Sequence, residues 1–273
     1  MSPVQSATNP LSGDVALVTG ASRGIGRSIA IVLAKAGAHV GLAARDLGGL
    51  EQAAEEIRKS GGSASVLPFD VADVQAADDL IHAVERVHGP LDLLVNNAGI
   101  NGDGIPFASS NMDHWWRVFE INVRGPAALC RAALSGMIGR RSGRIVNVSS
   151  GLGNVSIPSC SDYSATKAAL TRLTESIAVE LSGSGVFVFA ISPGMVRTDM
   201  TRNIASLRDL TDWDAPEAAG SLCVAIASGS LDKLAGRFFG VREGIDALIA
   251  STDKIVEQDM HVLRMTRIPT QGK

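Results

Sequence analysis

Short apolar runs alternate with amphipathic stretches along most of the chain after Asp14. In the amphipathic stretches the apolar residues recur at helical spacing, as at Ile25, Ile29 and Leu33, and the stretches end at glycines such as Gly37. This alternation is typical of β-α units built around a parallel sheet. The apolar runs predict seven strands: Val15–Thr19, His39–Ala44, Ser65–Phe69, Leu91–Asn96, Arg144–Ser149, Val186–Ile191 and Arg237–Val241.

The pattern therefore predicts an α/β fold: a Rossmann-type doubly wound sheet of about seven parallel strands, with helices on both faces, in a single domain. Residues 1–12 are rich in Ser, Pro and Asn and are expected to form a flexible arm before a domain of residues 13–242. Within that domain residues 195–214 are polar and aperiodic, which favours a mobile flap. Residues 243–273 have a helical pattern and are interpreted as a C-terminal extension.

Composition narrows the possible partners. The 273 residues are 45% hydrophobic and carry a formal net charge of −3 without any Lys/Arg run, which gives no reason to expect nucleic acid or a membrane surface as partner. No apolar stretch is long enough for a membrane span, and Met1–Ser12 does not resemble a secretory signal. The three cysteines are scattered and odd in number, so free thiols in a cytoplasmic protein are expected, and with the five histidines they form no metal-ligand cluster.

A glycine-rich turn follows the first predicted strand. Thr19–Gly26 reads TGASRGIG and leads into the first predicted helix, which is where open α/β sheets bind dinucleotides. Glycines allow backbone N–H groups to approach a pyrophosphate at the helix N-terminus. A purely structural turn is the alternative, and the position after the first strand favours the cofactor interpretation.

The end of the second strand bears on the choice between NAD and NADP. An NAD site usually has an acidic side chain there, whereas this chain has Ala44 followed by Arg45. A guanidinium pairs well with a 2′-phosphate, and Arg23 in the glycine turn could approach the same group, so the sequence predicts NADP(H). The alternative is that Arg45 is a solvated cation and Asp46 a helix N-cap.

Four motifs in order carry a resemblance to a known family: Thr19–Gly26, Asn96-Asn97-Ala98-Gly99, Tyr163-Ser-Ala-Thr-Lys167 and Pro193-Gly194. With them the chain closely resembles the single-domain short-chain dehydrogenase/reductases over about residues 14–241. The resemblance implies that Asp70 and Val71 flank the adenine, and that Thr198 holds the nicotinamide carboxamide. Asp70 could equally be a helix N-cap, and the asparagines mere turn formers. The complete implied cofactor set is Gly20, Ser22, Arg23, Gly24, Ile25, Gly26, Arg45, Asp70, Val71, Asn97, Ala98, Gly99, Tyr163, Lys167, Pro193, Gly194, Val196 and Thr198.

Tyr163 and Lys167 are four residues apart in a helical stretch, so their side chains share one face. An ammonium beside a phenol is expected to lower the tyrosine pKa toward working pH, as a general acid/base requires, although such a pair is otherwise common on protein surfaces. The resemblance implies that Ser150 hydrogen-bonds the substrate oxygen and that Asn122 holds a water in the proton path. Strand alternation points Ser149 the other way, so Ser149 is interpreted as structural.

The expected reaction is hydride transfer between NADP(H) and a small-molecule carbonyl or alcohol, with Ser150, Tyr163, Lys167 and Asn122 as the catalytic group. Similar proteins are homodimers or homotetramers, and the C-terminal extension puts the usual tetramer contact at the last strand in doubt. Three alternatives are a catalytically idle NADP-binding sensor or scaffold, an NAD-linked alcohol dehydrogenase of the same fold, and, disfavoured by the glycine spacing, an epimerase or dehydratase of the nucleotide-sugar branch. By resemblance the substrate pocket is lined by Asn101, Leu152, Cys160, Met195 and Trp213.

Overall fold

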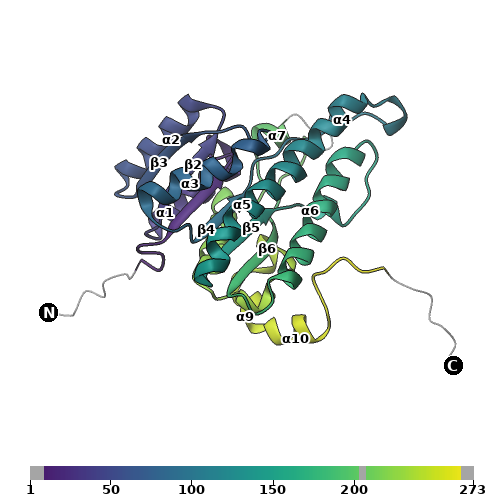
Figure 1. The fold of residues 1–273 in the computed structure, drawn as a ribbon. Helices are drawn as coiled ribbons and strands as arrows, with labels where there is room; N and C mark the ends of the chain where they lie inside the picture. The colour runs from purple at the N-terminus through teal and green to yellow at the C-terminus, as the bar shows by residue number, and fades with distance from the viewer. Residues whose placement is uncertain (1–8, 203–206, 266–273) are drawn as a thin grey trace.

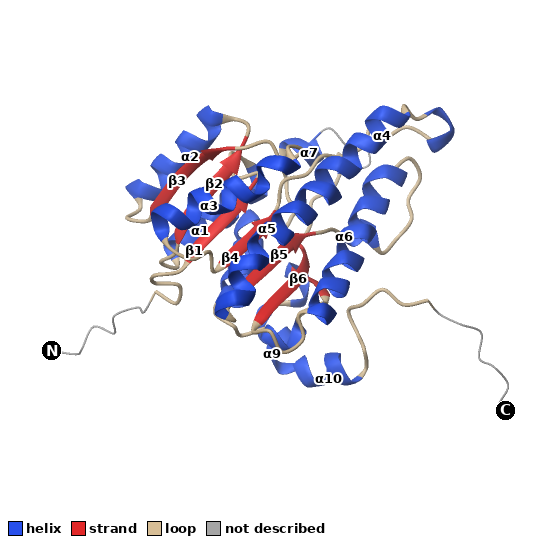
Figure 2. Cartoon of the chain, in the orientation of Figure 1, coloured by secondary structure: helices blue, strands red, loops and turns tan. Residues whose placement is uncertain are grey.

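In a computed structural model, which describes residues 9–202 and 207–265, the chain folds around one sheet of seven parallel strands (Figures 1 and 2). The strand order is β3-β2-β1-β4-β5-β6-β7, with the crossover point between β1 and β4. This confirms the predicted doubly wound sheet. The strands are β1 (Val15–Thr19), β2 (His39–Ala44), β3 (Ser63–Pro68), β4 (Leu93–Asn96), β5 (Gly143–Val148), β6 (Val186–Ser192) and β7 (Phe238–Gly240).

Helices cover both faces of the sheet. One face is packed by α1 (Gly24–Lys35), α2 (Leu47–Lys59) and α8 (Pro216–Ala227), and the other by α3 (Ala77–His88), α5 (Gly125–Arg140) and α6 (Ser161–Glu180). Neighbouring strand residues alternate between the two cores, with Val18 and Val95 on the α1 side and Leu17 and Leu94 on the other. The other α-helices in the described ranges are α4 (Met112–Phe119), α7 (Asp199–Arg202), α9 (Ile245–Ala250) and α10 (Thr252–Glu257).

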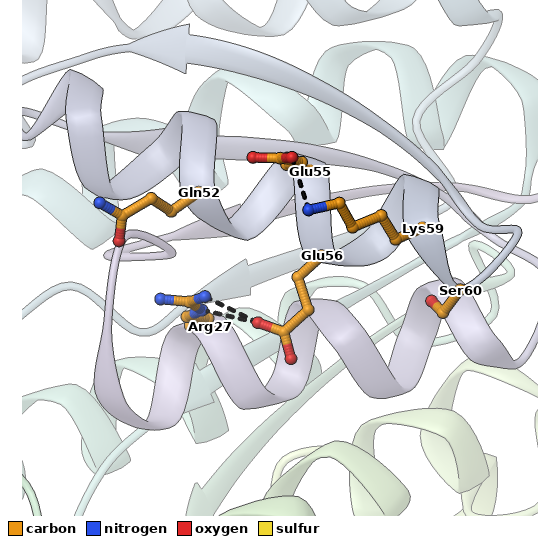
Figure 3. Close-up of a pocket in the computed structure, with 6 residues that line it drawn as sticks. All are labelled: Arg27, Gln52, Glu55, Glu56, Lys59 and Ser60. Carbon is orange, nitrogen blue, oxygen red and sulfur yellow. Dashed lines mark hydrogen bonds and ion pairs between the residues drawn. The ribbon is translucent and has the colours of Figure 1, made fainter.

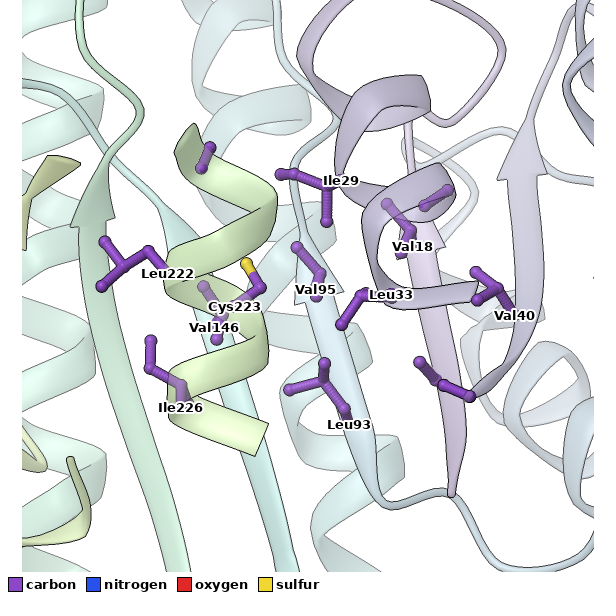
Figure 4. Packing of buried hydrophobic residues seen from close by; sticks show 14 of the residues in the cluster. Val18, Ile29, Leu33, Val40, Leu93, Val95, Val146, Leu222, Cys223 and Ile226 are labelled. Atoms are coloured by element: carbon purple, nitrogen blue, oxygen red, sulfur yellow. The ribbon is translucent and has the colours of Figure 1, made fainter. Parts of the chain in front are cut away.

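The core under α1 and α8 is built from fully buried aliphatic side chains (Figure 4). Ile29 and Leu33 of α1 and Leu222, Cys223 and Ile226 of α8 pack onto the valines of the central strands. The two helices approach so closely that a Cβ on Gly220 would lie 2.6 Å from Val32 Cβ. This packing holds the first helix, and with it the glycine turn, firmly against the centre of the sheet.

All seven predicted strands match the structure within two residues at each end. The expected flap contains the short helix α7, and the expected extension contains α9 and α10. The parts of the arm, flap and extension that cover residues 1–8, 203–206 and 266–273 lie outside the described residues. No helix within the described ranges is long and apolar enough to cross a membrane.

Candidate functional site

The glycine turn lies between β1 and α1, at the crossover point of the sheet. Gly20 and Gly24 have φ values of +67° and +57°, in the left-handed region that favours glycine. A Cβ on Gly26 would lie 2.3 Å from the Gly20 oxygen, so only glycine lets the helix begin this close to the strand. Thr198, from the segment after β6, lies beside Gly24: a Cβ on Gly24 would be 3.4 Å from the Thr198 Cγ2 atom.

The segment after β4 is tied directly to this turn. The backbone N–H groups of Asn97 and Ala98 both donate to Thr19 Oγ1, at 3.0 and 3.1 Å. The Asn97 side chain donates to the Thr19 carbonyl at 2.9 Å. Asn97 is therefore a bridge between two strand ends and not merely a turn former. Thr19 was not identified from the sequence as a site residue, although it opens the TGASRGIG motif.

Both arginines proposed for the 2′-phosphate are exposed and only loosely paired. Arg45 Nη1 lies 3.9 Å from an Asp70 oxygen, and Arg23 Nε lies 3.8 Å from an Asp199 oxygen. Such long, solvated ion pairs contribute little, so both guanidinium groups are available to an incoming anion. Asp46 is the N-cap of α2 and accepts a hydrogen bond from the Gly49 N–H, as the alternative interpretation predicted for it.

Asp70 and Val71 follow β3 at the same edge of the sheet. Asp70 Oδ1 accepts a hydrogen bond from the Ala72 N–H at 3.0 Å, an Asx turn that orients the loop. Val71 is buried, and a Cβ on Gly125 would collide with its carbonyl oxygen. Gly125 therefore permits α5 to pack against this loop.

The proposed catalytic residues meet between β5 and α6. Ser150 follows β5, and its Oγ accepts a hydrogen bond from the Leu152 N–H at 3.2 Å. Tyr163 and Lys167 share one face of α6, with Lys167 Nζ 5.5 Å from the centre of the Tyr163 ring. Lys167 is 4% exposed and donates to the Val148 carbonyl at 2.8 Å. Ser150 lies close enough to Tyr163 to influence its ionisation.

The ionisation of this pair differs from the sequence-based expectation. Burial raises the pKa of Tyr163 to about 12, against a smaller lowering by the Ser150 hydrogen bond. Burial also lowers the pKa of Lys167 to about 8. The prediction of a lowered tyrosine pKa was wrong for the protein by itself, because desolvation of the phenolate outweighs any attraction to the ammonium. The phenol is thus held in its proton-donating form.

Asn122 lies in a π-helical turn, Glu120–Arg124, that joins α4 to α5. There the Gly125 N–H bonds to the Glu120 carbonyl, five residues back instead of four. Such a turn shifts the hydrogen-bond register of the helix and frequently marks a functional site. The Asn122 side chain is fully buried and donates to Thr166 Oγ1 at 3.2 Å, so it connects this turn to α6. A Cβ on Gly99 would lie 3.1 Å from Asn122 Oδ1 and 3.8 Å from Lys167 Nζ, which places the β4 loop against both residues.

Ser149 is buried, in contrast to its neighbour Ser150. Its hydroxyl hydrogen-bonds the Lys167 carbonyl at 3.0 Å and the Thr171 hydroxyl at 2.9 Å. These contacts attach β5 to α6 and agree with a structural role.

The expected pocket residues lie on three loops, which follow β4, β5 and β6. The first and third loops touch where the Asn101 amide donates to the Met200 carbonyl at 3.0 Å. The flap is anchored by Asp214, whose carboxylate accepts a hydrogen bond from the Met195 N–H at 2.6 Å and pairs with Arg242 at 2.9 Å. The sequence analysis missed Asp214, because only folding brings it to Met195. Leu152 and Cys160 are half-buried on the second loop, as is Trp213 on the third.

A separate surface hollow between α1 and α2 contains none of the predicted site residues (Figure 3). An ion pair of Arg27 with Glu56 at 2.7 Å joins the two helices, and a second, of Lys59 with Glu55 at 2.6 Å, lies within α2. The four charged side chains that line the hollow are thus paired with one another, which leaves no unpaired charge there for a ligand.

Comparison with known proteins agrees with this geometry. Residues 14–209 match the short chain dehydrogenase family. A short chain dehydrogenase of Pseudocercospora fijiensis is 42% identical over 70% of this chain, and the match spans 62% of that relative's length. A gluconate 5-dehydrogenase of Gluconobacter oxydans is 37% identical over 74% of this chain and 79% of its own. A 3-oxoacyl-[acyl-carrier-protein] reductase of Synechocystis is 34% identical over 86% of this chain and 98% of its own.

Solved structures agree as well. A short-chain type dehydrogenase/reductase from Mycobacterium marinum superposes with a TM-score of 0.80 at 31% identity, over 85% of this chain and 95% of that one. A metagenomic short-chain oxidoreductase in complex with NADP superposes with a TM-score of 0.70 at 35% identity, over 80% and 92% of the two chains. With a parallel seven-stranded sheet and a glycine turn at its crossover point, this chain belongs to the short-chain dehydrogenase/reductase family.

Proposed function

We propose that the protein is an NADP(H)-dependent oxidoreductase that interconverts a ketone or aldehyde with an alcohol. The proposal rests on the packing of Asn122 and Lys167 against the loop after β4, beside the glycine turn. Tyr163 lies next to Lys167 on α6, and Ser150 lies close to Tyr163 at the end of β5. An idle sensor or scaffold would not need a serine and a tyrosine close together beside a buried lysine.

The glycine turn fits a dinucleotide. Because a Cβ on Gly20 or Gly26 would collide with neighbouring backbone or with Asn97, glycine at these two positions lets α1 begin directly against the ends of β1 and β4, where its backbone N–H groups could bind a pyrophosphate. The α1 N-terminus begins there and favours negative charge. Thr198 beside Gly24, together with Lys167, would hold the nicotinamide half.

The chemistry divides between the cofactor and the protein. A bound nicotinamide supplies or accepts the hydride. The Ser150 and Tyr163 hydroxyls donate hydrogen bonds to the substrate oxygen, where negative charge develops during reduction. Tyr163, protonated because burial raises its pKa to about 12, then gives its proton to that oxygen. Lys167 Nζ, fixed by the Val148 carbonyl, lies close enough to stabilise the tyrosine as it loses the proton.

Selection of NADP(H) over NAD(H) is assigned to Arg45 and Arg23. No acidic residue stands at the end of β2, where Ala44 is followed by Arg45. A 2′-phosphate would exchange the long contacts to Asp70 and Asp199 for charge-assisted hydrogen bonds. The NADP complex of the metagenomic relative supports this choice.

The test is a titration of the protein with NADPH and with NADH, followed by nicotinamide fluorescence. We expect NADPH to bind at least about tenfold more tightly, and Arg45→Ala to remove most of that preference. Arg27→Ala is the matched control, because Arg27 lies just after the glycine turn but pairs with Glu56. Equal binding of NADH would instead support an NAD-linked alcohol dehydrogenase.

Turnover separates the enzyme from an idle binding protein. With NADPH and a panel of ketones and aldehydes, Tyr163→Phe should reduce kcat by about 10²–10⁴-fold while NADPH binding remains, since only one hydroxyl is lost. If the wild-type protein binds NADPH but reduces none of the panel, the sensor or scaffold interpretation replaces this proposal.

A further inference from the structure

Asp162, the residue immediately before Tyr163, has no part in the reaction as described so far. It lies in the first turn of α6 and is only 5% exposed. Charged side chains are almost never buried to this degree without a specific reason. Its Oδ1 accepts a hydrogen bond from the Tyr163 N–H at 2.7 Å. The N-terminus of α6 thus stabilises the carboxylate with backbone dipoles.

The other carboxylate oxygen faces the loop after β4. A Cβ on Gly102 would lie 1.9 Å from Asp162 Oδ2, so the backbone of Gly102 packs directly on the carboxylate. The adjoining Asn101 is one of the proposed pocket residues, and its amide binds the Met200 carbonyl. Asp162 is therefore enclosed where the first turn of α6 meets the loop that forms one wall of the proposed site.

No counterion neutralises this carboxylate among the residues that the structure describes. Two nearby cations pair with other carboxylates: Arg202 with Asp199 at 3.3 Å, and Arg242, after β7, with Asp214 at 2.9 Å. Arg208 of the flap is exposed, so solvent screens its charge. Arg197 lies over the Trp213 ring at 5.6 Å but is exposed, so solvent screens its charge. A buried charge is screened much less than an exposed one. Two buried charges therefore lie near Tyr163: the Lys167 ammonium, which is bonded to the Val148 carbonyl, and the Asp162 carboxylate, which packs on the loop after β4.

The loops after β4, β5 and β6 also carry exposed apolar side chains, which indicate a preference for apolar substrate groups. Large apolar residues are exposed on the loop after β4, on the loop after β5 and on α7, namely Ile105, Phe107, Val155, Ile157 and Met200. The loops that carry them also carry the proposed pocket residues, and these loops touch at Asn101–Met200 and Gly102–Asp162. Exposed apolar side chains on the loops that carry the proposed pocket residues favour a ligand with an apolar portion.

We propose that Asp162 is a specificity-determining residue that selects uncharged carbonyl substrates with an apolar flank and disfavours carboxylate-bearing ones. The inference rests on the proposed reductase activity and narrows its substrate class. Gluconate is an anion, so this inference separates the protein from its relative the gluconate 5-dehydrogenase. If a substrate carboxylate bound about 10 Å from Asp162, the like charges would disfavour binding by about tenfold at an effective dielectric constant of about 20.

A matched substrate pair tests the proposal: 4-oxo-4-phenylbutanoate and its methyl ester, which share the ketone and the phenyl group and differ in charge. With NADPH, the wild-type kcat/KM should be at least about tenfold higher for the ester. Asp162→Asn keeps an oxygen acceptor for the Tyr163 N–H and should reduce that ratio by about tenfold. Asp103→Asn is the control. It removes an exposed charge from the loop after β4, next to Gly102, and should change the ester-to-acid ratio by less than about twofold.

Several outcomes would overturn the inference. A wild-type protein that reduces acid and ester equally well, or prefers the acid, contradicts it and points to Arg197 as the effective charge. A folded Asp162→Asn variant with an unchanged ratio contradicts it as well. If that variant unfolds, as its melting temperature would show, the inference is tested by the wild-type ratio of kcat/KM for the ester to kcat/KM for the acid.

Binding of the same pair to the NADPH-loaded protein, measured by calorimetry, keeps the two proposals apart. Selective binding of the ester without turnover contradicts the proposed reductase function but leaves the role of Asp162 intact. Turnover without selectivity contradicts the role of Asp162 alone. If the ester neither binds nor is reduced, both proposals are contradicted.

Discussion

The Asn122 side chain pairs with both backbone groups of Ile100. Its Oδ1 accepts a hydrogen bond from the Ile100 N–H and its Nδ2 donates to the Ile100 carbonyl, each at 2.9 Å. The amide thus mimics a strand partner for a loop that has no strand beside it. Both polar atoms of the Asn122 side chain are therefore engaged in structural hydrogen bonds. A relay water would then be bound by the backbone of the π-helical turn and not by this side chain.

Replacement of Asn122 tests this assignment. Asn122→Ala leaves both Ile100 groups and Thr166 without this partner in a buried region, which should lower the free energy of unfolding by about 1–3 kcal/mol. The loop after β4 should loosen, so we expect weaker NADPH binding together with a lower kcat. Chemical denaturation and NADPH titration of the same preparation measure the two effects. A variant with wild-type stability and a reduced kcat would show that the side chain acts in the proton path instead.

The neighbouring serines should separate catalysis from stability. Ser150→Ala removes a hydroxyl close to Tyr163, and we expect kcat to fall by about 10²–10³-fold with little change in melting temperature. Ser149→Ala removes a buried hydroxyl that bonds Lys167 and Thr171, and should cost about 1–2 kcal/mol of stability. Steady-state kinetics and thermal unfolding of both variants distinguish the two roles. The same kinetic defect in both would contradict the assignment of Ser149.

Gly26 and Gly139 differ in the space around their Cα atoms, so alanine substitutions at these two positions form a matched test. Gly26→Ala places a methyl group 2.3 Å from the Gly20 carbonyl oxygen and 2.4 Å from Asn97 Nδ2, so the turn must open. We expect a loss of about 1–3 kcal/mol and much weaker NADPH binding. Gly139→Ala, in α5, meets nothing within 4 Å and should instead stabilise the protein by up to about 1 kcal/mol. Denaturation midpoints of the two variants should therefore move in opposite directions.

The parts of this site that the sequence predicted are those set by local spacing. Tyr163 and Lys167 share a helix face because they are four residues apart, and the glycine turn follows its strand directly. The pKa of Tyr163 was predicted with the wrong sign because burial depends on how α6 packs against distant segments. The packing of Gly102 on Asp162 joins residues 60 positions apart, for which local patterns carry no signal.

The helices were predicted unevenly for a similar reason. The apolar stripe of α1 is visible in the sequence, whereas α8 was not identified. Much of α8 is small or apolar, from Ala218 to Ala227, so its buried face leaves only a weak periodic signal. The π-helical turn at Asn122 was not predicted either, because the sequence around it has the pattern of an ordinary α-helix. What the sequence could not supply was the environment of each residue, and that environment decides ionisation and selectivity.

Two histidines at the edge of the sheet make stability depend on pH. His39 of β2 and His88 of α3 stack with their ring centres 3.4 Å apart, and Ser65 Oγ bonds both rings at 3.0 and 2.6 Å. Burial, with smaller contributions from His88 and Arg58, lowers the pKa of His39 from 6.5 to about 4, and burial also lowers that of His88. The folded protein therefore resists placing a proton on either ring.

The sign of the effect follows from proton linkage. Between about pH 6.5 and pH 4 the unfolded chain binds a proton at His39 that the folded chain does not, so stability is lost as the pH falls through this window. His39 is partly exposed, and after allowance for solvent screening the loss is on the order of 1 kcal/mol. We expect His39→Gln to flatten the dependence of the free energy of unfolding on pH between 7 and 4.5, as measured by urea denaturation. His82→Gln, which changes an exposed histidine on the same helix α3 as His88, should keep the wild-type slope. Equal slopes in the His39→Gln variant and the wild type would show that the stacked pair ionises as freely in the folded protein as in the unfolded chain.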